Sequence, residues 1–388
     1  MRESELIQLR RAIHAHPELS GHEHRTHDTI AAYVRRFEPT EVLNHLGAVP
    51  GQGTGLAAIF DSGNPGKTVL VRAELDALPI FEQSDFAHRS VNRGVMHACG
   101  HDGHMTTVAA LAPRLQARPP ERGRVVLLFQ PAEETGAGAA DVLADERWPQ
   151  LEPDAAIALH NLPGYPTGQI ILREGVFSCA SVGMSVRLLG RTAHAAHPET
   201  GISPAPVIAE LIDRLPELPA ECLGDRFGLI SLTHVRAGDD HVFGTTPSEG
   251  VLNCTVRTDT DDDRAILAER AEALAREIAA EENVVCQISW HDDFAAAVCD
   301  APTVNVIRES AHELGMDVTD RPHPFRWSED FGRFTVGRKG VLFGVGSGVD
   351  QPALHNPDFD YPDELIQPGA DLFEAAARRL LSINEPET

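Results

Sequence analysis

The chain has 388 residues, 42% hydrophobic and 23% charged, which predicts a globular protein of two domains. Acidic residues outnumber basic ones by 58 to 33, a net charge of −25, which argues against nucleic-acid and anionic-membrane partners. Charges interrupt the apolar positions of the N-terminal segment, unlike a secretory signal, and no apolar run reaches membrane-spanning length. We therefore expect a cytoplasmic protein.

The first part of the chain alternates helix and strand signals. Apolar residues recur at helical spacing in 6–19, 26–37 and 102–117, and apolar strands are predicted at 54–61, 67–75, 124–130 and 154–161. Continuous apolar strands separated by helices predict a mostly parallel sheet covered on both faces. The ligand crevice of such a sheet lies beyond the carboxyl ends of its strands.

Residues capable of chemistry follow or close three of these strands. Glu74 and Asp76 follow the first, Glu133 and Glu134 follow the second, and His160 closes the third. We expect these side chains to converge at one edge of the sheet. Two adjacent carboxylates repel each other unless a cation or a proton intervenes, and we expect the side chains of Glu133 and Glu134 to point in different directions.

The pattern changes near residue 180. Strands at 181–190, 229–238, 250–260 and 284–293 and helices at 203–218 and 262–282 follow in the order strand, helix, strand, strand, helix, strand. That order predicts a compact α+β unit of the ferredoxin-like kind. A helix at 302–315, an apolar strand at 340–346 and a closing helix at 363–383 come after it. We therefore predict a discontinuous α/β domain, residues 1–180 and 294–388, interrupted by an inserted α+β domain, residues 181–293.

The stretch "HACGHDGH", residues 97–104, holds the densest group of candidate ligands. Gly100 lets the chain turn tightly enough for the Cys99 thiolate and the His101 imidazole to meet one metal ion. The alternative for this pair alone is a buried thiol beside a surface histidine. The other cysteines are scattered and form no Cys-x-x-Cys pair, which predicts reduced, mostly buried thiols.

Further candidate ligands lie far away in the sequence, His160 and, in the loop "PALHNPDFD", His355. Each alone is more often a structural histidine than a ligand. With Cys99, His101 and one glutamate they supply one thiolate, three imidazoles and one carboxylate, more than a single four-coordinate structural zinc requires. The set predicts a paired metal centre with an open position for water. Its mixed donors do not separate zinc from manganese, cobalt or nickel.

Two metal ions that share a water lower its pKa and clamp the oxygens that develop charge during hydrolysis. A general base must then take the proton and pass it to the leaving group. Glu133 is the candidate base, with its neighbour Glu134 as a metal ligand.

The sequence resembles the M20 metallopeptidases, specifically the amidohydrolase branch that includes auxin-conjugate hydrolases, hippurate hydrolases and N-acyl-amino-acid deacylases. The similarity spans nearly the whole chain, through "LRRAIHAHPELSGHE", "VRAELDALPI", "MHACGHDGH", "FQPAEETGAGA", "LHNLPGYPTG", "GRTAHAAHP", "TVRT", "SEDF" and "LHNPDFD". The resemblance implies Glu133 as general base and a set of metal ligands: Cys99, His101, Glu134, His160 and His355.

The same resemblance implies roles for residues around the ligands. Asp76 matches the acidic residue that orients a ligand histidine. Glu74 stands where this branch usually has aspartate and other branches have a metal-binding histidine. In M20 dimers the histidine that matches His194 reaches into the partner's active site and stabilises the oxyanion, whereas the alternative is a surface histidine.

Substrate-binding residues are predicted in the inserted domain. Arg257, in "TVRT", is a candidate clamp for a substrate carboxylate because the planar guanidinium matches that group. The alternative is an edge-strand arginine paired with Asp259 or a neighbour. Gly244, in "GTTP", replaces the asparagine with which the family positions substrate; either the nearby His241 compensates or the substrate differs.

We therefore predict an amidohydrolase with two divalent ions, zinc or manganese, in which a metal-bound water cleaves the amide bond of an N-acyl amino acid. A dipeptidase or carboxypeptidase with the same site is the close alternative. A non-catalytic metal-binding or ligand-binding protein is the third interpretation, and the presence of a general base argues against it. The resemblance also implies a homodimer formed through residues 181–293, which would act as a lid and dimerisation domain.

Overall fold

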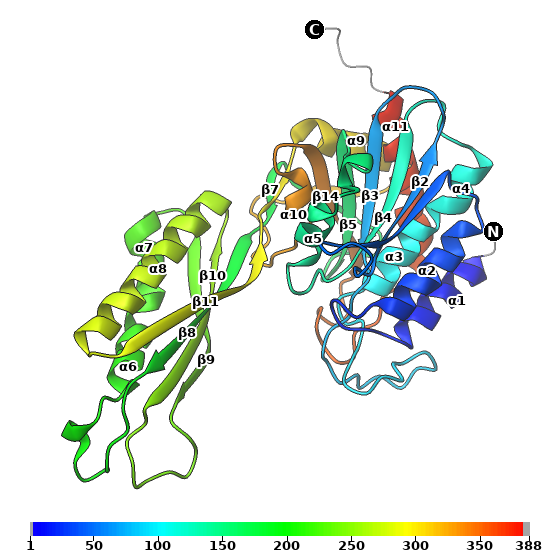
Figure 1. Ribbon diagram of the computed structural model, residues 1–388. Coiled ribbons are helices and arrows are strands. Elements are labelled where there is room, and N and C mark those ends of the chain that lie inside the picture. The colour runs from blue at the N-terminus through cyan, green and yellow to red at the C-terminus, as the bar shows by residue number, and fades with distance from the viewer. Residues whose placement is uncertain (1–2, 383–388) are drawn as a thin grey trace. The chain divides into compact units, whose positions relative to one another are not determined.

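The computed structural model describes residues 3–382, which form two compact units. The larger unit comprises the described parts of Met1–Phe177, Ala297–Pro324 and Glu329–Thr388, and the smaller unit comprises Ser178–Ala296 and Phe325–Ser328. Figure 1 shows the elements of both units along the chain. Among the described helices, none combines the length and the apolar character needed to cross a bilayer.

The larger unit is built on an eight-stranded sheet in the order β1-β2-β4-β3-β5-β14-β6-β13. Its strands are β1 (Glu41–Leu46), β2 (Gly55–Asp61), β3 (Thr68–Glu74), β4 (Arg124–Gln130), β5 (Ala155–Pro163), β6 (Ile170–Leu172), β13 (Val318–Asp320) and β14 (Lys339–Gly348). The central strands β4, β3, β5 and β14 run parallel, whereas β1 and β2 are antiparallel at one edge. A small second sheet pairs β7 (Gly175–Ser178) with β12 (Ala297–Cys299).

Helices cover this sheet. They are α1 (Glu3–His14), α2 (His24–Arg35), α3 (His101–Ala109), α4 (Leu111–Ala117), α5 (Gly138–Ala144), α9 (Ala301–Glu313), α10 (Gly332–Thr335) and α11 (Ile366–Ser382), with short 3-10 turns η1 (Trp148–Gln150) and η4 (Asp363–Leu365). Helices α1, α2 and α3 pack side by side, α3 and α11 pack on β3, and α9 and α10 pack on β14 (Figure 1). Every residue of β3 is buried, as a strand with both faces covered requires. The predicted mostly parallel α/β architecture is confirmed.

The smaller unit is an antiparallel sheet in the order β11-β8-β10-β9 with helices packed against it. Its elements are β8 (Ala180–Leu189), η2 (Pro198–Thr200), α6 (Ala205–Arg214), η3 (Leu215–Glu217), α7 (Leu218–Leu223), β9 (Gly228–Ala237), β10 (Glu249–Thr258), α8 (Asp261–Glu281) and β11 (Val285–Phe294). Alternate residues of β10 are buried, and Leu252 and Val256 join Leu267 and Leu274 of α8 in one apolar cluster. The predicted α+β fold is confirmed. The segment 325–328 belongs to this unit, where Phe325 forms a parallel bridge with Ser178.

Two predicted helices are interrupted, and proline explains both interruptions. The helix expected over 102–117 breaks between α3 and α4 at Ala110. Pro113 lacks the N–H that would bond to the carbonyl of Ala109, four residues earlier, so α3 ends there. The helix expected over 203–218 breaks at Arg214 for the same reason, because Pro216 cannot continue the α-helical pattern.

Candidate metal centre

The HACGHDGH segment turns sharply at Gly100 before α3 begins. Gly100 has φ of 94°, a left-handed conformation that favours glycine. A Cβ atom there would lie 2.4 Å from Oδ1 of Asn161 on β5. The turn therefore requires glycine, and it places Cys99 and His101 on either side of the N-terminal end of α3.

Helix α3 is anchored to α1 through a buried ion pair. Oδ2 of Asp102 accepts hydrogen bonds from Nη1 of Arg10 and from Nδ1 of His14, each at 2.9 Å. Burial opposes a charge on His14, but Asp102, with Glu82 and Asp360, outweighs that effect and raises the pKa of His14 to about 9. The N-terminal helix thus holds the segment that carries Cys99 and His101.

The predicted ligands come together at the carboxyl ends of the parallel strands. Sγ of Cys99 lies 3.5 Å from Nε2 of His160. Oε1 of Glu134 lies 3.8 Å from Nε2 of His101 and 3.7 Å from Nε2 of His355. Donor atoms lie within 4.8 Å of one another in the groups Cys99, His101, His160 and Cys99, Glu134, His355.

Hydrogen bonds orient two of the imidazoles toward this cluster. Nδ1 of His101 donates to the main-chain oxygen of Asp76 at 2.9 Å, with Oδ1 of Asp76 at 3.3 Å. Nδ1 of His160 donates to the main-chain oxygen of Asn161 at 2.9 Å. In the neutral form of each ring the lone pair is therefore on Nε2, which faces the cluster, the arrangement typical of metal-binding histidines.

The cluster also contains buried polar atoms that lack hydrogen bonds within the described chain. They include Nε2 of His101 and Oε1 of Glu134. Buried polar atoms are normally paired, and lone pairs that face a thiol and other imidazoles suit coordination to a metal ion. The residues present thus fit a metal centre.

The electrostatics of the cluster point the same way. Burial raises the pKa of Glu134 to about 7, with Asp76 adding to the shift and His101 opposing it. Burial, reinforced by Glu329 and Glu134, also raises the pKa of Glu133 well above its usual value. Burial is the main cause of both shifts and neighbouring carboxylates add to it; a divalent cation would offset both effects.

The expectation that Glu133 and Glu134 point in different directions is wrong. Oε2 of Glu133 and Oε1 of Glu134 both lie 3.8 Å from Nε2 of His101. The two residues belong to a tight turn, in which the N–H of Gly136 donates to the carbonyl of Glu133 at 2.7 Å. Successive side chains in a turn do not alternate between opposite faces as they do in a strand, so neighbours can approach one point.

A buried network that sequence reasoning missed lies behind the ligands. Arg72 on β3 donates to Glu329 at 2.7 and 3.0 Å, to Asp330 at 2.6 Å, to Gln130 at 2.8 Å, and also to Glu74. The sequence feature that could have indicated this network is an arginine, Arg72, within an otherwise apolar strand. The partners in "SEDF" could not be assigned, because nothing local links them to β3.

Glu74 is part of this buried network. It is fully buried and accepts from Arg72 and from Nδ1 of His104, the latter at 2.8 Å. His104 also bonds Oδ1 of Asn161 at 2.6 Å. Glu74, His101 and His104 are close enough to form another candidate metal group. Because Glu74 already pairs with Arg72 and His104, we interpret it as a support for His104, not as a ligand.

Three of the residues predicted in the smaller unit, His194, His241 and Gly244, lie on exposed loops. Nδ1 of His194 accepts from the N–H of Ala196 at 3.0 Å, and His194 forms a bridge with Thr245. The carbonyl of Gly244 accepts from Ala195 N–H at 3.0 Å, with open space where a side chain would stand. His241 is exposed with φ of 64°.

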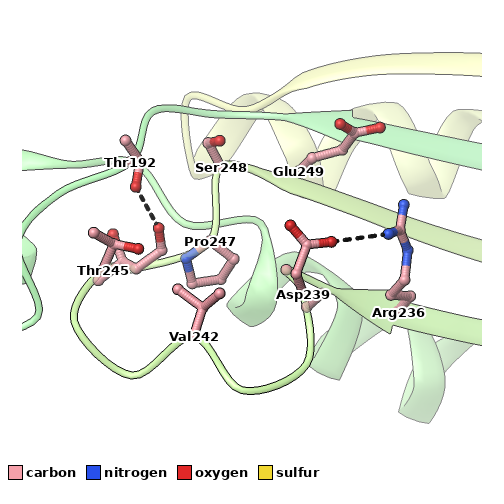
Figure 2. A pocket seen from close by; sticks show the side chains of 11 residues that line it. Thr192, Arg236, Asp239, Val242, Thr245, Pro247, Ser248 and Glu249 are labelled. Carbon is pink, nitrogen blue, oxygen red and sulfur yellow. Dashed lines mark hydrogen bonds and ion pairs between the residues drawn. The ribbon is translucent and has the colours of Figure 1, made fainter.

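A pocket of about 240 Å³ lies in the same loop region of the smaller unit (Figure 2). Its labelled lining includes Thr192, Val242 and the ion pair between Arg236 and Asp239. The hydroxyl of Thr192 donates to the carbonyl of Thr246 at 2.7 Å and so connects two segments of the pocket lining that are far apart in the sequence. The pocket carries both charge signs and is distinct from the ligand cluster, which belongs to the larger unit.

Arg257 does not lie on an edge strand. It lies on β10, an inner strand between β8 and β9, and its Nη1 donates to the carbonyl of Arg326 at 3.1 Å and to Oγ of Ser328 at 3.0 Å. Asp259 instead accepts from Sγ of Cys179 at 3.5 Å. The edge-strand position and the pair with Asp259 are therefore wrong, although Arg257 does bond other nearby groups. Burial lowers the pKa of Arg257, as expected for a cation held beside neutral acceptors.

Comparison with known proteins agrees with this geometry. A family model described as peptidase family M20/M25/M40 matches residues 70–379. The N-acetyl-L-cysteine deacetylase of Bacillus subtilis (strain 168) is 30% identical over 388 residues, covering 99% of this chain and 90% of that protein.

Solved structures share the fold. A dinuclear metal-binding peptidase of the M20 family from Bacillus subtilis matches with a TM-score of 0.80 at 28% identity, covering 98% of this chain and 99% of that one. An aminobenzoyl-glutamate utilization protein from Klebsiella pneumoniae matches with a TM-score of 0.74 at 20% identity, covering 97% and 95%. The chain therefore belongs to the M20/M25/M40 peptidase family, in its amidohydrolase branch.

Proposed function

We propose that this metal-dependent amidohydrolase binds two divalent ions and cleaves the amide bond of N-acyl amino acids. One observation carries the proposal: a thiol, three imidazoles and a carboxylate from separate parts of the chain converge, and two of their buried atoms, Nε2 of His101 and Oε1 of Glu134, lack a hydrogen bond within the described chain. A single structural zinc needs four ligands. The relative from Bacillus subtilis is named for the removal of an acetyl group from an amino acid, which supports the same bond type here.

The proposed metal ligands are Cys99, His101, Glu134, His160 and His355. When bound, two divalent ions lower the pKa of a shared water and polarise the carbonyl of the scissile amide. The mixed sulfur, nitrogen and oxygen donors suit zinc or manganese, and cobalt or nickel can occupy similar sites. Asp76 holds His101 in the tautomer that leaves Nε2 free.

Glu133 is the proposed general base. Its side chain is almost fully buried and borders the ligand cluster, with Oε2 3.8 Å from Nε2 of His101. The N–H of Asp330 donates to Oε1 at 3.4 Å and leaves Oε2 facing the cluster. A carboxylate whose pKa is raised accepts a proton from the attacking water more readily and can return it to the leaving nitrogen.

The smaller unit supplies the proposed substrate groups. Arg257 bonds only neutral oxygens among the described residues, so its charge is available for a substrate carboxylate. We propose that His194 stabilises the oxyanion and that the loop of His241 and Gly244 shapes the substrate site. The cytoplasmic location predicted from the sequence is retained as part of this proposal.

Metal analysis and a substrate panel test the proposed function together. We expect about two divalent ions per chain, loss of hydrolysis after chelation and recovery when zinc or manganese is restored. The panel comprises N-acetyl and N-benzoyl amino acids and dipeptides, with release of the free amino acid as the measured product. Preferential cleavage of dipeptides would favour the peptidase alternative. Metal binding without cleavage of any of these amides would contradict the proposal.

We also propose a homodimer formed through residues 181–293. The edge strands β9 and β11 carry exposed apolar side chains, among them Val235, Val285 and Trp290, and such edges are prone to pair with another strand. Light scattering of the purified protein should give twice the mass of one chain, and Val285→Lys should shift the population toward monomer. A monomer at working concentrations in the unmodified protein would contradict the dimer.

A further inference from the structure

The turn that carries Glu133 and Glu134 begins with an unfavourable backbone conformation. After β4 the chain passes through Pro131 to Ala132, which has φ of 48°. Residues with a Cβ atom rarely adopt this left-handed region. Ala132 therefore needs outside contacts to hold it there, and its conformation sets the direction in which Glu133 leaves the strand.

The contact on Ala132 comes from Glu23, over a hundred residues away in the sequence. Oε1 of Glu23 accepts from the N–H of Ala132 at 2.8 Å and from the N–H of Gly21 at 2.9 Å, and Oε2 accepts from the hydroxyl of Thr54 at 2.6 Å. Glu23 has 0% of its surface exposed. Burying a carboxylate is costly unless hydrogen bonds replace the lost water, and here they do.

The carboxylate of Glu23 contacts the turn and not the neighbouring helix α2. Glu23 is the residue before α2, and its carboxylate makes no hydrogen bond to the first turn of that helix. Glu18 serves that end of the helix instead. Its Oε2 accepts from the N–H and the hydroxyl of Thr26 at 2.8 and 2.9 Å. The Glu23 side chain is thus committed to the turn and not to its own helix.

A second buried carboxylate holds the far end of the same turn. Oδ2 of Asp76 accepts from the N–H of Glu134 at 2.9 Å and from the hydroxyl of Ser20 at 2.7 Å. Glu133 therefore lies between two clamped main-chain N–H groups, one held by Glu23 and the other by Asp76.

From this geometry we infer that Glu23 is a positioning residue, which fixes Ala132 and so aims the carboxylate of Glu133; the inference rests on the proposed function. What matters is that the Glu23 side chain is long enough to accept a hydrogen bond from the Ala132 N–H, and not that it is charged. A misplacement of a catalytic group by about 1 Å can lower turnover by about 100-fold.

Three substitutions of Glu23 separate reach from charge. Glu23→Gln keeps an oxygen for Ala132 and removes the charge, so we expect kcat within about threefold of the unmodified enzyme. Glu23→Asp keeps the charge but withdraws it by one methylene, so kcat should fall about 10- to 100-fold with KM little changed. Glu23→Ala should behave like Glu23→Asp if it folds. A kcat that followed charge, with Gln impaired and Asp normal, would overturn the inference.

Glu18→Ala is the matched control. It removes capping bonds from α2 and leaves the carboxylate of Glu23 on Ala132. We expect it to lower the melting temperature without lowering kcat. If Glu18→Ala reduced kcat as much as Glu23→Asp, the effect of Glu23 would be structural and the inference wrong.

Hydrogen exchange gives a readout that does not depend on activity. Peptides spanning residues 131–137 should exchange faster in Glu23→Asp than in the unmodified protein or in Glu18→Ala, because the Ala132 amide loses its acceptor. Unchanged exchange in Glu23→Asp would contradict the clamp. A protein that cleaves no panel substrate would contradict the proposed function, yet the exchange experiment would still decide whether Glu23 holds the turn.

Discussion

Replacing Glu133 by Gln should lower kcat by about 100- to 10,000-fold while the chain keeps its metal ions. The Gln side chain matches Glu in shape and can still accept the N–H of Asp330, which lies 3.4 Å from Oε1 in the unmodified protein. It cannot accept a proton from the attacking water. The measurement is the turnover number on the best panel substrate, with metal content determined on the same sample.

Glu134→Gln is the contrasting variant. Glu134, Cys99 and His355 form one candidate metal-binding group. Replacing the Glu134 carboxylate should therefore reduce metal content together with activity. Only the combination of retained metal in Glu133→Gln and lost metal in Glu134→Gln supports the assigned roles. Substantial turnover in Glu133→Gln would show that another group is the base, and the reverse metal pattern would exchange the roles of the two residues.

The sequence predicted the ligand cluster because its members follow from topology. Glu134 follows β4 and His160 lies on β5, two parallel strands with β3 between them, and the carboxyl ends of parallel strands share one edge of the sheet. Cys99 and His101 were predicted from a local turn, and Gly100 has the left-handed conformation that this turn requires. His355 was predicted as a further imidazole donor and the family resemblance supported it, but nothing in its loop indicates where the loop folds.

The supporting contacts could not be predicted in the same way. Arg72 meets Glu329 across 257 positions of sequence, and Glu23 meets Ala132 across 109. Such pairs depend on how the loops after β4 and before α10 pack against the sheet, which no periodicity encodes. The directions of Glu133 and Glu134 were mispredicted for a related reason, because the sequence does not show the turn that carries them, which follows the left-handed residue Ala132.

The Arg72 network leads to the second large effect, which is on stability. The side chain of Arg72 is fully buried, and so are its acidic partners Glu74, Glu329 and Asp330. Arg72→Met preserves much of the volume but leaves these carboxylates without their cation. Removing one partner from a buried ionic group costs about 3 to 5 kcal/mol. Urea titration of metal-depleted protein should show that loss in the free energy of unfolding, since bound ions would add stability of their own.

Arg308→Met is the matched control on the surface. Arg308 forms two hydrogen bonds with Asp320, at 2.8 and 2.9 Å, but Asp320 is 62% exposed. Exposed pairs contribute about 1 kcal/mol or less, because water and salt screen them. An equal loss in both variants would show that burial of the Arg72 charge network is not what makes it important.

The pH dependence of the Arg72→Met deficit separates charge from packing. Burial alone would raise the pKa of Glu74, but Arg72 and His104 outweigh burial and hold it well below the usual value of 4.5. A carboxyl with a lowered folded pKa stabilises the protein above its unfolded pKa, and that stability is lost as the pH falls. Without Arg72 the buried carboxylates favour their neutral forms. The deficit should therefore be largest near neutral pH and shrink below about pH 5, whereas a constant deficit would mean that Arg72 stabilises the fold by packing.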